Sequence, residues 1–255
     1  TAKLGKIALG AGEKITLDFV GDGLMSVTVP SKKLDTIKDI NGKTLKSLIS
    51  NTGILKANGG IIQLSAATAR SLSRSSVNIG SSGIIIARSV GDKTGKVVIG
   101  SPSNNRIKIS GKIDVNGYKS VSPSGTVIVK GRNIYHSGNI YASGKSGGKV
   151  NLITKDSLKL DGSIIAKASK EKGGSVLFMS ENSIKSTKKA VVDVSGQNKG
   201  GEIRSLAKMN NSTSGSYKAN TSSGYGGNID ITANQVEISQ ATIEAKGKIM
   251  GGKVR

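Results

Sequence analysis

Apolar and polar residues alternate along most of the chain in runs of three to five residues, as in β-strands that bury one face. One five-residue motif recurs every 24 to 30 residues: an aliphatic residue, any residue, Ala or Val, any residue, and usually Gly. A fixed period of this length is typical of proteins built from stacked repeats. The motif begins at Leu55, Ile85, Ile113, Ile140, Ile164, Val192 and, after a double step of 51 residues, Ile243.

Two further elements lie between the copies of this motif. A pair of glycines precedes alternating apolar residues at 147–152, 173–178 and 226–231, and a third alternation follows at 157–160 and 235–238. Each repeat therefore holds about three short strands, with Gly, Asn or Asp where the chain turns or takes positive φ. The pattern predicts an all-β fold, a parallel β-helix of about eight coils with three short strands per coil.

Stacking of equivalent residues makes two internal columns. The first positions of the motif form one column, and the third positions form a column of small residues beside it, namely Ala57, Ala87, Val115, Ala142, Ala166, Val194 and Ala245. Four polar residues at similar places before the third strand leave two interpretations, a hydrogen-bonded ladder or ordinary turn residues: Asn133, Asp156, Asn182 and Asn234.

Residues 205–224 interrupt the pattern, because they are polar and poor in strand-forming residues. We expect this stretch to be a loop that bulges from the rod and replaces part of a coil. Asn210, Asn211 and Asn220 each begin an Asn-x-Ser/Thr triplet there, and the sequence leaves open whether any of them is glycosylated.

Catalytic chemistry has little support in the composition. The chain has no cysteine, which excludes thiolate metal sites, disulfides and thiol catalysis. The single histidine, His136, has no second metal-ligating residue near it in sequence, and Asp114, Asp193 and Glu244 occupy equivalent positions that are not on adjacent coils. We therefore expect no catalytic residues, no metal, no cofactor and no enzyme activity.

The chain carries 38 Lys and Arg against 16 Asp and Glu, a formal net charge of +22. A solvated, lysine-rich surface and a face that binds polyanions such as sulfated glycans both explain this excess. Only 7 of the basic residues are Arg, which disfavours specific nucleic-acid recognition. The candidate polyanion-binding residues are Lys167, Lys170, Lys172, Lys185, Lys188 and Lys189.

Residues 7–29, from Ile7 to Val29, resemble the end of the secretion domain in the filamentous haemagglutinin family, the large exoproteins of two-partner secretion. The stretch Asn51–Leu64 resembles the first of that family's Gly-rich repeats. The family's Asn-Pro-Asn-Leu and Asn-Ser-Asn-Leu motifs are absent. The resemblance implies a right-handed parallel β-helix, with the last coils of the secretion domain in residues 1–35 and a repeat shaft in 36–255.

The same resemblance implies secretion from a Gram-negative bacterium, through a dedicated outer-membrane transporter that acts on the missing upstream region, to the cell surface. We expect a structural shaft segment of a virulence-related surface adhesin. The alternatives are the stalk of a contact-dependent growth-inhibition toxin and a polyanion-binding module; a carbohydrate-active β-helix enzyme is disfavoured. The sequence starts at Thr1 and stops within a repeat, so we expect a piece of a longer protein, and no apolar run is long enough to span a membrane.

Overall fold

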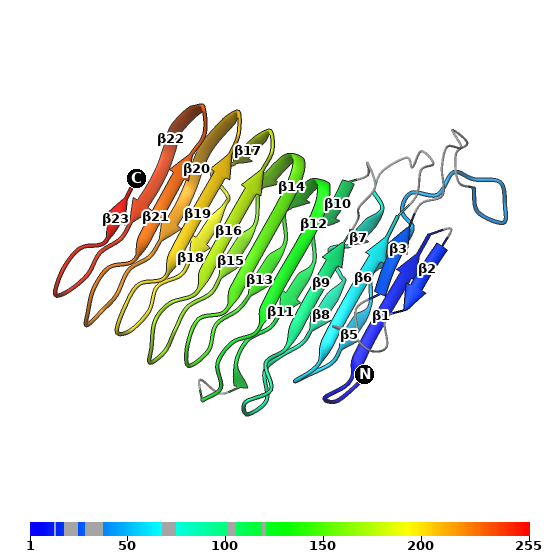
Figure 1. Cartoon of the computed structure of the whole chain (residues 1–255), viewed down its shortest axis with the longest axis horizontal. Helices are drawn as coiled ribbons and strands as arrows, with labels where there is room; N and C mark the ends of the chain where they lie inside the picture. Colours follow the sequence, from blue (N-terminus) through cyan, green and yellow to red (C-terminus); the bar gives the residue numbers. More distant parts are fainter. Residues whose placement is uncertain (13, 18–24, 29–37, 68–74, 101–105, 119–120) are drawn as a thin grey trace.

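The computed structural model describes residues 1–12, 14–17, 25–28, 38–67, 75–100, 106–118 and 121–255. They form a parallel β-solenoid of about seven turns, close to the eight expected, with the two ends of the chain at opposite ends of the rod (Figure 1). No α-helix occurs in these residues. The predicted all-β parallel fold with three short strands per coil is therefore confirmed.

The strands build three faces, which we call A, B and C in the order in which each coil visits them. Face A contains β1 (Lys6–Ala11), β6 (Ile61–Ala66), β9 (Lys96–Gly100), the first halves of β12 (Thr126–His136) and β14 (Lys149–Leu160), β16 (Ser175–Ser180), β19 (Glu202–Ala207), β21 (Asn228–Thr232) and β23 (Lys253–Val254).

Face B contains β4 (Ile49–Asn51), β7 (Val77–Ile79), β10 (Arg106–Ile109), the second halves of β12 and β14, β17 (Ser183–Ser186), and the first halves of β20 (Asn210–Lys218) and β22 (Gln235–Glu244). Face C contains β5 (Ile54–Lys56), β8 (Ile84–Ile86), β11 (Lys112–Asp114), β13 (Asn139–Tyr141), β15 (Ser163–Ile165), β18 (Val191–Asp193) and the second halves of β20 and β22.

A separate antiparallel pair, β2 (Lys14–Leu17) with β3 (Met25–Thr28), lies at the N-terminal end, where β3 contacts β1 and β6. β1 pairs in register with β6, so residues 6–11 already belong to the solenoid. Residues 13, 18–24 and 29–37 lie outside the described part of the chain, and the domain boundary at residue 35 stays a prediction.

The core follows the two predicted columns. Strand register stacks the aliphatic column in the expected order on face C, and residue positions in adjacent coils are about 4.8 Å apart. Its middle members are fully buried, while Leu55 and Ile243, on the first and last copies, are partly buried. The double step before Ile243 contains one more residue of the aliphatic column, Tyr217. It pairs with Val192 on one side and with Ile243 on the other.

The expected loop at 205–224 is wrong, because this stretch forms a complete coil. β19 and β20 pair in register with the coils on both sides. The inward positions hold polar residues that are buried and bonded to one another. The Asn211 amide donates to the Ser205 carbonyl and hydroxyl oxygens at 2.9 Å, and the Thr213 hydroxyl donates to the Asn211 oxygen at 3.3 Å. This network takes the place of apolar packing, which is why the alternation of apolar residues disappears.

The turn from face C to face A depends on close backbone approach. The second glycine of each pair donates its N–H to the carbonyl of the small-column residue in its own coil, as Gly201 does to Val194 at 2.8 Å. A Cβ on Gly201 would lie 2.1 Å from the Gly174 carbonyl oxygen of the neighbouring coil. The sequence suggested positive φ for the corners, but neither Gly174 nor Gly201 adopts it.

Candidate functional site

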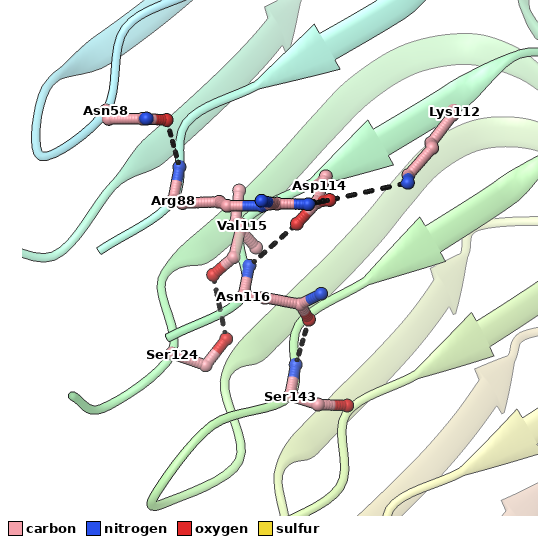
Figure 2. A network of polar contacts seen from close by, with 8 residues as sticks. All are labelled: Asn58, Arg88, Lys112, Asp114, Val115, Asn116, Ser124 and Ser143. Atoms are coloured by element: carbon pink, nitrogen blue, oxygen red, sulfur yellow. Dashed lines mark hydrogen bonds and ion pairs between the residues drawn. The ribbon is translucent and has the colours of Figure 1, made fainter. Parts of the chain in front are cut away.

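The best-defined polar cluster lies where face C ends, around Asp114 (Figure 2). Asp114 closes β11 and points outward, yet it is only 1 % exposed. The Arg88 guanidinium of the preceding coil donates to its Oδ2 through Nη2 at 2.7 Å and Nε at 3.1 Å. Lys112 Nζ lies 3.5 Å from the same oxygen, and the Asn116 N–H donates to Oδ1 at 3.2 Å. The cluster therefore joins two neighbouring coils at a corner.

Electrostatics keep the Asp114 carboxylate ionised. Burial by itself would raise the pKa of this carboxyl, but the hydrogen bonds from Arg88 and Asn116 and the charges of Arg88 and Lys112 outweigh it and lower the pKa below its ordinary value. The carboxylate in turn raises the pKa of Arg88 through the shared hydrogen bond. Because folding lowers the pKa of Asp114, the resulting stabilisation is present above its ordinary pKa and is lost as the pH falls through the folded value.

The other outward carboxylates of face C are held in similar ways. Asp193 lies 3.6 Å from Lys167 Nζ and accepts the Ser195 N–H at 2.9 Å. Glu244 lies 2.6 Å from Lys246 Nζ and accepts a hydrogen bond from Asn220 at 3.0 Å. Each carboxylate is bound to a cation, and the three are on separate coils. The arrangement ties coils together and supplies no pair of carboxylates that could act as general acid and base.

Metal binding and histidine chemistry find no site in the described ranges. There, no group of three or more His, Asp or Glu side chains is placed to hold a metal ion. His136 points into the core and is fully buried between Ile109 and Leu160 of the adjacent coils. Burial lowers the pKa of its imidazole to about 4. A ring in this position is closed to any substrate.

A polar ladder exists, but mostly at another corner than the sequence suggested. After face C, side-chain oxygens accept the backbone N–H of the next coil, as Asn116 Oδ1 does from Ser143 and Asn220 Oδ1 does from Lys246, both at 2.7 Å. Asn58, Ser143 and Ser195 act in the same way. These bonds satisfy backbone groups that the parallel pairing leaves free. The signal in the sequence was Asn or Ser at the fourth position of the recurring motif.

Of the two interpretations that the sequence left open for Asn133, Asp156, Asn182 and Asn234, the ladder holds for one rung only. Asn182 donates to Asp156 Oδ1 at 3.0 Å across adjacent coils. Asn133 is displaced by one position and accepts from Ser157 instead, because Asn133 and Ser157 are in register. The position between Asn182 and Asn234 is occupied by Met209, so the column is not continuous.

The six candidate lysines are all exposed, but the structure does not gather them into one patch. Lys167, Lys170 and Lys172 lie in the turn from face C to face A, and Lys167 is paired with Asp193. Lys185 is in the middle of β17 on face B. The remaining two, Lys188 and Lys189, lie in the turn from face B to face C.

A different basic row forms on face B. Lys108, Tyr135, Lys159 and Lys185 are in register on four successive strands and point outward. Lys159 and Lys185 are direct neighbours, with no acidic residue between them, and Lys159 Nζ lies 5.3 Å from the centre of the Tyr135 ring. Like charges on adjacent strands are unfavourable. We call these four residues the face-B row; sequence reasoning found only Lys185, because its members are one period apart in the chain.

The three Asn-x-Ser/Thr triplets differ in access. Asn211 is buried in the polar coil, which excludes it as a glycosylation acceptor while the chain is folded. Asn220 has its amide bound to Glu244 and its oxygen bound to the Lys246 N–H. Asn210 is exposed at the start of β20. Among the three, Asn210 presents the most accessible side chain.

No protein-family model, curated protein or solved structure matches the chain. The resemblance to the filamentous haemagglutinin family thus stays a hypothesis that rests on residues 7–29 and 51–64. The described residues also include no helix with the length and apolarity needed to cross a bilayer.

Proposed function

We propose that this chain is a structural shaft segment of a secreted bacterial surface adhesin of the filamentous haemagglutinin type, without enzymatic activity of its own. The observation that carries the proposal is the uninterrupted in-register pairing of coils from β4 to β22 on faces B and C. Each coil presents its edge to the next, so folding can advance coil by coil as the chain emerges from an outer-membrane transporter. The product is a stiff rod that holds other regions of the protein away from the cell.

The proposal predicts that a whole coil can be removed without loss of function. Residues 163–190 make one coil, because Ser163 and Val191 occupy equivalent positions. Deleting them from the complete natural protein should leave surface display and adherence of the bacterium unchanged. Deleting only residues 163–176 removes β15 from face C and the start of β16 from face A. The strands that follow can then no longer pair in register with the preceding coil, and display should be abolished.

Display is measured by antibody binding to intact cells, and adherence by attachment of bacteria to host cells. Display without adherence after the whole-coil deletion would identify this segment as a binding module and overturn the shaft proposal. Display that does not depend on the partner transporter would contradict two-partner secretion.

Polyanion binding is a second candidate function, and the face-B row favours it. Lysines placed side by side without acidic partners gain from a bound polyanion, which neutralises both and releases counterions. We expect replacement of Lys108, Lys159 and Lys185 by Gln to lower the salt needed for elution from heparin. Replacement of Lys167, Lys170, Lys172, Lys188 and Lys189 should have less effect; if only this second variant changes elution, the face-B row is not the site.

A further inference from the structure

The outward side of face A is apolar at positions where a solvent-facing strand normally carries polar residues. Val98 and Ile128 are direct neighbours on β9 and β12, and Leu177 follows two strands further in the same column. In the next outward column Ile153, Met179 and Leu206 are consecutive neighbours on β14, β16 and β19. Met179 is 40 % exposed and the other five are partly exposed. We call these six residues the face-A patch.

Lysines border the face-A patch at both ends of its strands. Lys96 and Lys149 stand at the start of β9 and β14, and Lys130 and Lys155 stand near the opposite edge. None of the four forms an ion pair with a described residue. At that edge the patch continues into a groove of about 410 Å³ whose lining includes Lys130, Ile153 and Lys155.

We propose that the face-A patch with its four lysines docks the rod sideways onto a bilayer that contains anionic phospholipids. Exposed apolar side chains can enter the boundary between headgroups and acyl chains. Lysine side chains lay their aliphatic stems along such a surface and bring their ammonium groups to the phosphates. The apolar centre of this surface fits the acyl chains of a flat bilayer, and its cationic ends fit the anionic headgroups.

Charge also decides against a second copy of the chain as the occupant. Two copies that meet through this face would bring their unpaired lysines together, and each carries a formal net charge of +22. A soluble polyanion is the alternative occupant, and the experiment separates it from a bilayer.

The test is sedimentation of the chain with vesicles of phosphatidylcholine alone or with about 30 % phosphatidylglycerol. We compare Lys130→Gln/Lys149→Gln/Lys155→Gln on face A with Lys108→Gln/Lys159→Gln/Lys185→Gln on face B. Both variants lose the same net charge. Near an anionic surface each lysine contributes about a fivefold change in affinity, so the face-A variant should bind roughly 100-fold more weakly. The face-B variant should retain most of its binding.

The apolar contribution is tested with Leu177→Ser/Met179→Ser, which alters only outward side chains and should keep the thermal unfolding profile. Binding to the anionic vesicles that survives at about 0.5 M salt should be lost in this variant, because salt screens the lysines and leaves apolar contacts.

Four results would overturn the proposal: no vesicle binding by the unaltered chain, equal binding to the two kinds of vesicle, equal loss in the two lysine variants, or unchanged high-salt binding in the serine variant. Retention on heparin that depends on the face-A lysines, together with absent vesicle binding, would assign the surface to a soluble polyanion. None of these results bears on the shaft proposal, which is tested separately by coil deletion.

Discussion

His136 places an imidazole inside an otherwise aliphatic part of an inward column. Its neighbours in register are Ile109 and Leu160, and both ring nitrogens are buried without a hydrogen-bond partner among the residues that the structure describes. A buried polar group that has lost its water without gaining a partner destabilises a fold by about 1–3 kcal/mol. We therefore expect His136→Leu, which continues the aliphatic column, to raise the free energy of unfolding at pH 7 by about this amount.

The same substitution should change how stability depends on pH. Burial lowers the pKa of His136 from 6.5 to about 4, so the unfolded chain binds a proton more readily than the folded one. Stability is then lost as the pH falls from about 6.5 to about 4, by about 3 kcal/mol in all and by about 2 kcal/mol at pH 5. The leucine variant lacks this contribution.

The measurement is guanidinium unfolding followed by circular dichroism at pH 7 and pH 5. Carboxylates titrate equally in both proteins, so the difference between the two pH dependences isolates His136. Ile109→Leu is the matched control, since it alters the same column without changing a titratable group, and it should keep the pH dependence of the unaltered chain. Equal pH dependence in the chain and in His136→Leu, or a leucine variant that is less stable at pH 7, would refute the reasoning.

Five further substitutions test the packing and the Arg88–Asp114 ion pair. Ile164→Asp buries an unpaired carboxylate and should cost several kcal/mol, whereas Ile165→Asp, on the outward side, should change the melting temperature little; equal losses would mean that the register is wrong. Gly201→Ala should destabilise by about 1–3 kcal/mol through its clash with a carbonyl, while Gly53→Ala, with open space around it, should be tolerated in the same thermal unfolding assay. Arg88→Met should lower stability by about 1–2 kcal/mol at pH 7, a reduced value because this side chain is 46 % exposed, and an unchanged unfolding midpoint would contradict the role given to the ion pair.

The repeat predicted the architecture because stacking imposes the same residue type at the same place in each coil. Ile113, Ile140 and Ile164 could be aligned by eye, and the structure puts them in direct register. Apolar alternation does not mark the coil at 202–218, where buried Ser205 and Asn211 satisfy each other's hydrogen bonds. Hydrophobicity marks an inward position only when the core there is apolar. Inward positions that hold a polar network therefore cannot be predicted from the pattern of apolar residues.

The candidate site was harder to predict, for a related reason. The sequence predicts the six lysines at the corners of adjoining coils, yet Lys185 lies in the middle of β17 and consecutive corners of a coil point in different directions. Neighbours on the surface are one period apart, as Lys159 and Lys185 are. Reading the outward positions by register, as is done for the inward columns, would have found the face-B row and the apolar column that begins with Val98 and Ile128.

The two kinds of column also differ in what they can reveal about function. An inward residue must suit its neighbours about 4.8 Å away, so its identity reports on packing. An outward residue also meets solvent or a partner, so an outward column that departs from mixed polar residues calls for an explanation other than packing. On face C, Asp114 and Asp193 are each bound to a cation, which accounts for them as links between coils. The four lysines that border the face-A patch and the three of the face-B row form no ion pair with a residue that the structure describes. Charge that served solubility alone would have equal effects on either face, and this is why two variants of equal net charge can decide whether the excess positive charge has a specific role.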